Sequence, residues 1–334
     1  MKRIAILGGG SWGTALAIVL SRSHVAHHLA LWVQEADLAA AMSVQRSNDA
    51  YLPGLLIPPQ VTISNLMPEV LDGADIVLGA VPAAHARSVY TQTLPALNAR
   101  MVFVSATKGL EPGTQARMSE ILAQVLGGRF RPRIAVLSGP SFALEAARGD
   151  PTAVVIAAQD AGLAAALQNE FAGKTFRLYT NSDPLGVELA GAMKNVIAIA
   201  AGACEGVGLG HNSIAALITR GLAEMTRLAT ALGARAETLS GLAGLGDLVL
   251  TCTGSLSRNR SVGVQLGRGR PLADILAGMR MVAEGVGTAA ALRDLAGAAG
   301  VEMPISRQVY AILYEGMSPR EGIREIMERP LKHE

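Results

Sequence analysis

The chain contains few of the residues that mark several common protein classes. Its 334 residues include only two cysteines, Cys204 and Cys252, and 4% aromatic residues. Two cysteines are too few for a disulfide framework in a chain of this length, and they form no CxxC pair. The formal net charge is +2 without a block of lysine or arginine, unlike a nucleic-acid-binding face. These absences favour a reducing cytoplasmic setting and no nucleic-acid partner.

The N-terminus lacks a long uninterrupted apolar run. Lys2 and Arg3 precede an uncharged stretch, residues 4–21, that resembles a signal peptide. Glycines 8–10 interrupt this stretch after four apolar residues, so it is too short to insert into a membrane. We therefore expect neither a secretion signal nor a membrane anchor. The six histidines form no HExxH motif, so no metal site is expected.

The first half of the chain has the pattern of an α/β fold. Half of all residues are apolar, and the length favours two domains. Up to about residue 180, short β-rich runs alternate with longer alanine-rich stretches, which indicates βαβ units. Most of these runs are continuously apolar, as in strands covered on both faces. We predict a Rossmann-like, doubly wound, mostly parallel sheet with strands at 3–7, 28–33, 61–64, 75–81, 101–105, 133–138, 152–157 and 176–180.

The pattern changes at residues 181–184, where Asn, Ser, Asp and Pro cluster and no further strand is indicated. Beyond them the chain is rich in Ala, Leu and Met and is broken by glycine-rich loops, which predicts long helices. We expect a dinucleotide-binding domain over 1–182 and an all-helical substrate-binding and catalytic domain over 183–334. Its apolar helices are compatible with a homodimer.

A glycine motif follows the first predicted strand directly and precedes a predicted helix. Residues 8–13 read Gly-Gly-Gly-Ser-Trp-Gly and fit GxGxxG. In this context Gly8 permits a tight turn, Gly10 lets backbone amides approach a pyrophosphate, and Gly13 lets helix and strand pack closely. The helix N-terminus adds unpaired N–H groups for the phosphates. The motif predicts NAD(H) or NADP(H) as the cofactor.

The end of the second predicted strand bears on the choice between the two cofactors. It places Gln34 and Glu35 about 20 residues beyond the glycines, where the adenosine ribose would lie. A carboxylate there accepts a hydrogen bond from the ribose 2′-OH and repels a 2′-phosphate. We therefore expect NADH to be used at least as well as NADPH.

Several spaced motifs resemble one family almost from end to end. They are GGGSWGTA at 8–15, YLPG at 51–54, ATKGLEPGT at 106–114, SGPSFALE at 138–145, MKNVIAIAAG at 193–202, ALITRGLAEMTRL at 216–228, GLAGLGDLVLTCTGSLSRNR at 241–260, VAEG at 282–285 and EMPI at 302–305. In this order they resemble the NAD(P)-dependent glycerol-3-phosphate dehydrogenases. The resemblance implies reversible reduction of dihydroxyacetone phosphate to sn-glycerol 3-phosphate, which supplies glycerophospholipid synthesis.

The resemblance assigns the proton donor to Lys194. We expect Lys194 early in a helix that starts near residue 185, within an apolar sequence that removes the amine from water. Asp247 follows a glycine-rich segment, so it can cap a helix as well as orient the lysine. By resemblance Lys108 contacts both substrate and cofactor, and its position after a strand places it where open α/β sheets bind ligands.

The remaining site residues are also implied by the resemblance. Ser257, Arg258 and Asn259 form a donor-rich cluster suited to a phosphate, because guanidinium groups match its oxygens. We expect a helix to begin near Ser141 and to direct N–H groups at the ligand. The other implied substrate contacts are Gly139, Ser141, Asn195 and Thr251. The other implied cofactor contacts are Ser11, Trp12, Ala143, Arg258, Val282 and Glu284.

Two alternatives share parts of this pattern. A 6-phosphogluconate or β-hydroxyacid dehydrogenase has the same order of domains, and fold alone does not exclude it. The segments ATKG, SGPSFA and SRNR favour the glycerol phosphate family. A non-catalytic NAD(H) sensor would not need Lys108, Lys194 and Asp247 together.

Overall fold

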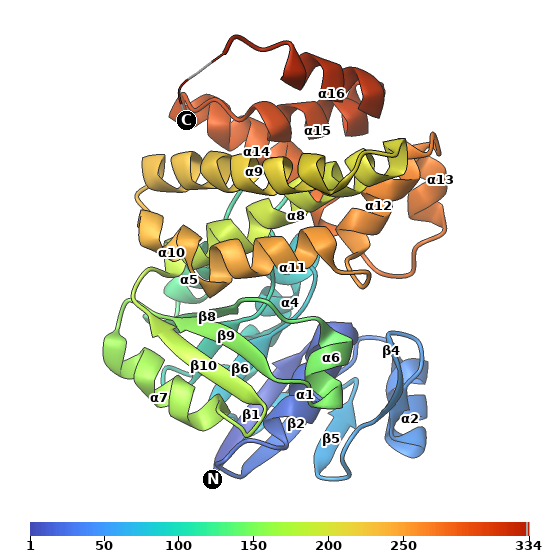
Figure 1. Ribbon diagram of the computed structural model, residues 1–334. Helices are drawn as coiled ribbons and strands as arrows, with labels where there is room; N and C mark the ends of the chain where they lie inside the picture. The colour runs from blue at the N-terminus through green and yellow to red at the C-terminus, as the bar shows by residue number, and fades with distance from the viewer. Residues whose placement is uncertain (332, 334) are drawn as a thin grey trace. The chain divides into compact units, whose positions relative to one another are not determined.

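The computed structural model describes residues 1–331 and 333. Residues 332 and 334, at the end of the predicted second domain, lie outside the described residues. The chain divides into two compact units (Figure 1), one of residues 1–111 and 116–188 and one of residues 112–115 and 189–334. The division between the units falls near the start of α8 (Pro184–Val207). The functional domains at 1–182 and 183–334 remain a prediction.

The first unit is built on an eight-stranded sheet with the order β10-β9-β8-β7-β6-β1-β2-β5. Every predicted strand is present, with shifts of one or two residues at the ends. Neighbouring strands are parallel except β8 and β9, which are antiparallel. The Rossmann-like fold class is confirmed. The strands are β1 (Lys2–Leu7), β2 (His27–Trp32), β5 (Val61–Ser64), β6 (Ile76–Gly79), β7 (Val102–Ser105), β8 (Arg133–Ser138), β9 (Thr152–Ala157) and β10 (Phe176–Asn181).

Side-chain alternation along β1 supplies two separate cores. Ile4 and Ile6 pack on one face of the sheet, and Ala5 and Leu7 pack on the other. The first face carries α1 (Ser11–Leu20), α6 (Ala143–Arg148) and α7 (Ala161–Phe171). The second carries α3 (Met67–Leu71), α4 (Ala86–Thr93) and α5 (Met118–Gly127), with short 3₁₀ turns at Ala83–His85 and Leu94–Ala96. Figure 1 shows α6 beside α1 and α7 beside β10.

A small hairpin was not predicted from the sequence. After α2 (Ala36–Gln45), the strands β3 (Ser47–Asn48) and β4 (Leu52–Leu56) pair antiparallel as a separate two-stranded sheet. Pro53 and Gly54 lie inside β4, and both residue types are unfavourable in strands, so the sequence resembles a loop. The YLPG motif lies in this hairpin, with Tyr51 in the turn and the other three residues at the start of β4.

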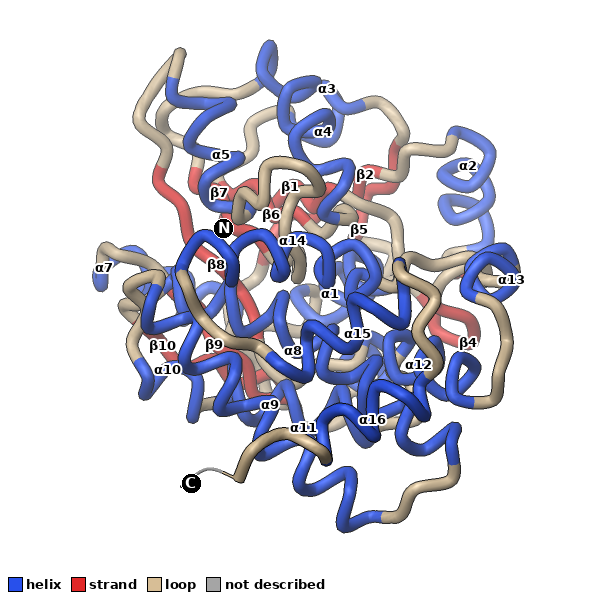
Figure 2. Tube along the Cα trace, turned by 90° about the horizontal axis from the view of Figure 1, so that it is seen from above, coloured by secondary structure: helices blue, strands red, loops and turns tan. Residues whose placement is uncertain are grey.

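In the second unit, all the regular elements among its described residues are helices. α8 is long and apolar enough to cross a membrane by composition, but 94% of its most apolar 18-residue window is buried inside the protein. In Figures 1 and 2, α15 lies against α16. The later elements are α9 (His211–Ala231), α10 (Ala236–Ser240), a π-helical turn (Leu242–Gly246), α11 (Asp247–Thr253), α12 (Arg258–Gly267), α13 (Leu272–Ala277), α14 (Glu284–Ala299), α15 (Pro304–Tyr314) and α16 (Pro319–Met327).

A buried carboxylate holds the start of α15. Glu224 of α9 is 3% exposed and accepts hydrogen bonds from the backbone N–H groups of Ile305, at 2.7 Å, and Ser306, at 3.2 Å. These are N–H groups that a helix leaves unpaired at its N-terminus. Burial raises the pKa of Glu224, and the hydrogen bonds from Ile305 and Ser306 oppose that rise. Glu224 therefore links α9 to α15 through a side chain rather than through apolar packing alone.

Candidate active site

Two glycines of the 8–13 motif are required by the fold itself. Gly8 has a φ of +121°, a conformation that other residues rarely adopt. A Cβ on Gly13 would lie 1.9 Å from the carbonyl oxygen of Gly8, so only glycine permits this contact between loop and helix. The predicted roles of Gly8 in the turn and Gly13 in close packing match this geometry.

Gly10 is not required in this way. It is the N-cap residue of α1, and its carbonyl accepts the N–H of Thr14 at 3.0 Å. A Cβ on Gly10 would meet no protein atom within 4 Å. Internal packing therefore gives no reason for glycine here, whereas the close approach of a ligand does. The first turn of α1 carries no acidic side chain to repel an anion, so the loop fits a dinucleotide pyrophosphate.

Apart from Lys108, the other predicted cofactor residues of the first unit lie at positions 11–12, 34–35 and 143. Gln34 and Glu35 are exposed just after β2, and Glu35 is the N-cap residue of α2. Ser11 and Trp12 open α1, with the Trp12 ring packed against the core. The helix expected near Ser141 starts later, at Ala143, and has only six residues. Their contacts with a cofactor remain predictions.

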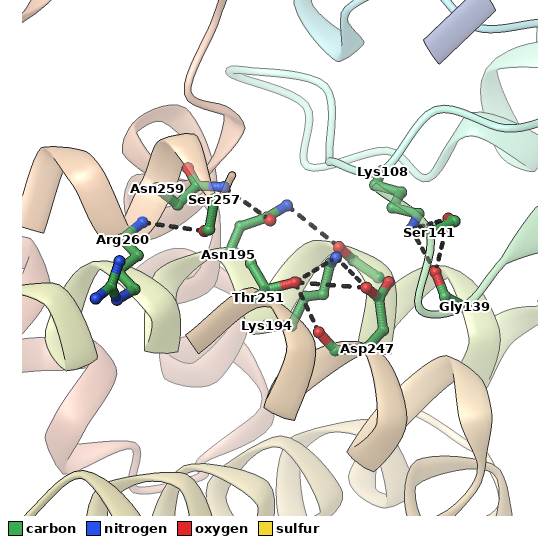
Figure 3. A network of polar contacts seen from close by, with 11 residues as sticks. Lys108, Gly139, Ser141, Lys194, Asn195, Asp247, Thr251, Ser257, Asn259 and Arg260 are labelled. Carbon is green, nitrogen blue, oxygen red and sulfur yellow. Dashed lines mark hydrogen bonds and ion pairs between the residues drawn. The ribbon is translucent and has the colours of Figure 1, made fainter. Parts of the chain in front are cut away.

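Lys108 is held at the carboxyl end of the sheet. Its Nζ donates to the carbonyl oxygen of Gly139 at 2.8 Å and to Ser141 Oγ at 3.3 Å (Figure 3). Lys108 follows β7 and the other two residues follow β8, its neighbour in the sheet. Gly139 has a φ of +130°, and a Cβ there would lie 3.0 Å from Val154 Cα. The structure thus brings these three predicted residues together.

Lys194 lies in the second unit within a buried polar cluster. Its Nζ donates to Asp247 Oδ1 at 2.5 Å and to Thr251 Oγ1 at 2.8 Å (Figure 3). Lys194 is 5% exposed and Asp247 is 1% exposed. A buried ammonium needs such a counter-charge, because isolated charges are strongly disfavoured away from water. The predicted pairing of Lys194 with Asp247 is thus present in the structure.

One local expectation for this cluster was wrong. Lys194 lies near the middle of α8 rather than early in it, because the helix extends to Val207. Of the two roles left open for Asp247, the structure shows the contact with the lysine: Asp247 is the first residue of α11, after the N-cap residue Gly246, and its carboxylate accepts a hydrogen bond from Lys194. Four residues later, one turn along α11, Thr251 presents its hydroxyl on the same side. α11 therefore supplies both partners of the lysine.

The neighbouring Asn195 belongs to a bridge that links three helices. Asn259 Nδ2 of α12 donates to Asn195 Oδ1 of α8 at 2.8 Å. Asn259 Oδ1 accepts the backbone N–H of Gly285, near the start of α14, at 2.9 Å. Asn259 is thus tied to two protein groups, and Nδ2 keeps a second hydrogen. Sequence reasoning assigned Asn259 to a phosphate and did not anticipate the bridge.

Backbone contact between α8 and α12 sets this bridge. A Cβ on Gly202 would lie 2.0 Å from the Arg260 carbonyl oxygen, and one on Gly263 would lie 2.0 Å from the Ile199 carbonyl oxygen. Arg260 also pairs with Glu205 of α8 at 2.5 Å. The glycines let the two helix backbones touch, which brings residue 259 beside residue 195. The GxxxG spacing at 202–206 and at 263–267 is the sequence signal that could have indicated this contact.

The start of α12 holds the other predicted phosphate ligands. Ser257 is its N-cap residue, and Oγ accepts the N–H of Arg260 at 3.2 Å. Burial lowers the pKa of Arg258, and the carboxylate of Glu284 opposes this effect. Arg258 and Glu284 are both predicted cofactor contacts and lie close enough to interact. Val282, the third such residue in this unit, is 48% exposed.

Comparison with known proteins gives the same assignment. The family model described as NAD-dependent glycerol-3-phosphate dehydrogenase N-terminus matches residues 3–164, and the C-terminus model of the same enzyme matches residues 183–324. The chain belongs to the NAD-dependent glycerol-3-phosphate dehydrogenase family. The match of both halves does not favour the alternative of a 6-phosphogluconate or β-hydroxyacid dehydrogenase.

Relatives across this family match nearly the whole chain. A glycerol-3-phosphate dehydrogenase (NAD(P)+) of Koribacter versatilis is 57% identical over 331 residues, covering 99% of this chain and 98% of the relative. One from Acidobacterium capsulatum is 52% identical and covers both chains fully. The crystal structure of glycerol-3-phosphate dehydrogenase from Coxiella burnetii has a TM-score of 0.92 at 40% identity, covering 98% of this chain and 99% of that one.

Proposed function

We propose that the protein reduces dihydroxyacetone phosphate to sn-glycerol 3-phosphate, reversibly, with NADH or NADPH, and so supplies glycerophospholipid synthesis. The family assignment supports this reaction. The observation that carries it in this chain is the buried cluster of Lys194, Asp247 and Thr251, with the lysine 2.5 Å from the carboxylate. A lone buried lysine would be disfavoured, whereas a paired one holds a proton ready for transfer.

When bound, the nicotinamide cofactor supplies the hydride that the carbonyl carbon accepts. Lys194 gives the proton that the resulting alkoxide oxygen needs, and it regains one from solvent afterwards. Asp247 and Thr251 hold the amine in place and Asp247 stabilises its charged form. Ser257 and Arg258 bind the phosphate through hydroxyl and guanidinium donors, and Asn259 adds its second amide hydrogen. Lys108, with Gly139 and Ser141, contacts substrate and cofactor.

The experiment is to follow oxidation of NADH and of NADPH with dihydroxyacetone phosphate as substrate. We expect turnover with both, NADH being used at least as well because Glu35 follows β2. A strong preference for NADPH would contradict the role of Glu35. No turnover with either cofactor, in protein that still binds dinucleotide, would contradict the proposed reaction.

The setting of the enzyme belongs to the same proposal. Cys204 and Cys252 are buried and unpaired, which fits a reducing cytoplasm. Burial raises the pKa of the Cys252 thiol to about 12, so this thiol stays protonated and unreactive. We also propose a homodimer, which sedimentation analysis would test.

A further inference from the structure

The YLPG motif has no role in the site described so far, yet its hairpin holds a fully buried polar side chain. Asn48, the last residue of β3, is 0% exposed. We propose that Asn48 is a positioning residue for the dinucleotide loop: its amide fixes the Gly9–Gly10 peptide so that the Gly10 N–H faces the cofactor pyrophosphate. This inference rests on the proposed function, because it needs the loop to bind a dinucleotide.

Every polar group of the Asn48 side chain has a partner. Nδ2 donates to the carbonyl oxygen of Gly9 at 2.8 Å and to Thr14 Oγ1 at 2.8 Å. Oδ1 accepts the backbone N–H of Tyr51, the first residue of YLPG, at 3.2 Å. The bond from Tyr51 fixes which end of the amide is the oxygen, so the NH₂ end must face the glycine loop. The motif thus orients the side chain that reaches the loop.

The direction of the Gly10 N–H follows from peptide geometry. None of the peptide bonds among the described residues is cis, so the C=O of Gly9 and the N–H of Gly10 point in opposite directions within one plane. Because Asn48 holds the Gly9 oxygen, the Gly10 N–H points away from Asn48. A Cβ on Gly10 would meet no protein atom within 4 Å, so the protein leaves open space beside this residue for a phosphate.

The hairpin is itself anchored to the main sheet. Arg46, which ends α2 with a φ of 54°, donates to the carbonyl oxygens of Val61 at 2.9 Å and of Ile57 at 3.3 Å. The Ile57 N–H returns a hydrogen bond to the Arg46 carbonyl at 2.7 Å. Val61 begins β5, the edge strand of the sheet. Asn48 therefore acts on the loop from a fixed base, 39 residues away in the sequence.

A purely structural role would predict a different result. In that case loss of Asn48 would lower stability and leave the intrinsic affinity of the folded protein for dinucleotide unchanged. A positioning role predicts a loss confined to ligands that carry the pyrophosphate. ADP-ribose, which has the pyrophosphate but no nicotinamide, separates this effect from hydride transfer.

The test compares Asn48→Asp and Asn48→Ala with Thr14→Val. The aspartate keeps the shape and the acceptor for Tyr51 but cannot donate to Gly9. Thr14→Val keeps the 2.8 Å bond from Asn48 Nδ2 to the Gly9 oxygen and removes the Thr14 hydroxyl, whose own contact with that oxygen is longer, at 3.5 Å. We expect the Kd of both NADH and ADP-ribose, measured by calorimetry, to rise about tenfold in the Asn48 variants and less than about twofold in Thr14→Val. The KM for dihydroxyacetone phosphate and kcat at saturating NADH should stay within about twofold.

Unchanged Kd values in folded Asn48 variants, or an equal rise in Thr14→Val, would overturn the inference alone. Failure of the wild-type chain to bind ADP-ribose and NADH would overturn it together with the proposed function. If the Asn48 variants do not fold, NMR of the wild-type protein replaces them. The Gly10 amide resonance should then shift when ADP-ribose is added. An amide that does not respond would contradict its place at the pyrophosphate.

Discussion

The glycine loop of the first unit and the lysine cluster of the second obtain their polar groups in opposite ways. The loop uses backbone groups from six consecutive residues, 8–13, and its shape depends on side chains being absent. The cluster uses side chains, with Lys194 meeting partners 53 and 57 residues further along the chain. A local motif of the first kind can be recognised in a sequence, whereas the second kind exists only after folding. Substitutions that add a side chain therefore test the loop, and substitutions that remove a charged group test the cluster.

The largest effect is expected at the cluster. Lys194→Met should lower kcat by about 10³-fold, because general acid catalysis contributes 10²- to 10⁴-fold and the methionine has no proton to give. NADH binding should be retained, as checked by calorimetry. Lys174→Met, at an exposed lysine, is the matched control and should behave as wild type. Comparable activity in the two variants would contradict the role of Lys194.

The effects of substituting Lys194 and Asp247 on the free energy of unfolding should not be additive. Asp247→Leu leaves a buried ammonium without its counter-charge, so the free energy of unfolding should fall by about 3–5 kcal/mol. The double variant Lys194→Met with Asp247→Leu should be more stable than the sum of the two single changes implies. Urea unfolding of the four proteins measures this coupling. Strict additivity would mean that the two charges do not interact.

Two alanine substitutions in the loop separate folding from binding. Gly13→Ala places a Cβ 1.9 Å from the Gly8 carbonyl oxygen. It should therefore cost about 3 kcal/mol of unfolding free energy. Gly10→Ala meets no protein atom and should change stability by less than about 1 kcal/mol while raising the NADH Kd at least about tenfold. Thermal unfolding and calorimetry on both variants check this. A loss of stability in Gly10→Ala with an unchanged NADH Kd would show that Gly10 serves packing.

The smallest expected effect concerns pH. Burial raises the folded-state pKa of Glu224 above its ordinary 4.5, so the native chain holds this proton more tightly than the unfolded chain. The stability that this group contributes is complete below pH 4.5 and is lost as pH rises through the raised pKa. Above pH 4.5, the free energy of unfolding should fall less steeply with pH in Glu224→Gln than in the wild type, by at most about 1.4 kcal/mol per pH unit. Glu237→Gln, at an exposed glutamate, is the matched control for the change of side chain.

The sequence predicted most of the first unit because its strands are continuous apolar runs. All eight strands of the main sheet were expected, down to the short run Val61–Ser64. The β3–β4 hairpin was missed, because Pro53 and Gly54 suppress the strand pattern. The hydrogen bond from Asn48 to the Gly9 carbonyl was missed with it. The family and its reaction class were recognised from spaced motifs.

Long-range contacts explain what was not predicted in the second unit. The Asn259 bridge depends on α8 and α12 meeting backbone to backbone, and the GxxxG spacing in each helix does not say which helix is its partner. The pairing of Lys194 with Asp247 was expected only from the resemblance, and the structure supplied its geometry.

The contact between α8 and α12 also limits how this region can move. Side chains between two helices can change rotamer on a nanosecond timescale and let the helices drift. Backbone atoms meeting at Gly202 and Gly263 have no rotamers to change. The backbones of α8 and α12 can then separate here only if a whole helix slides, which is a collective motion of microseconds or longer. The α8 and α12 backbones at this contact should therefore move relative to each other only in the slow, collective motions of the enzyme.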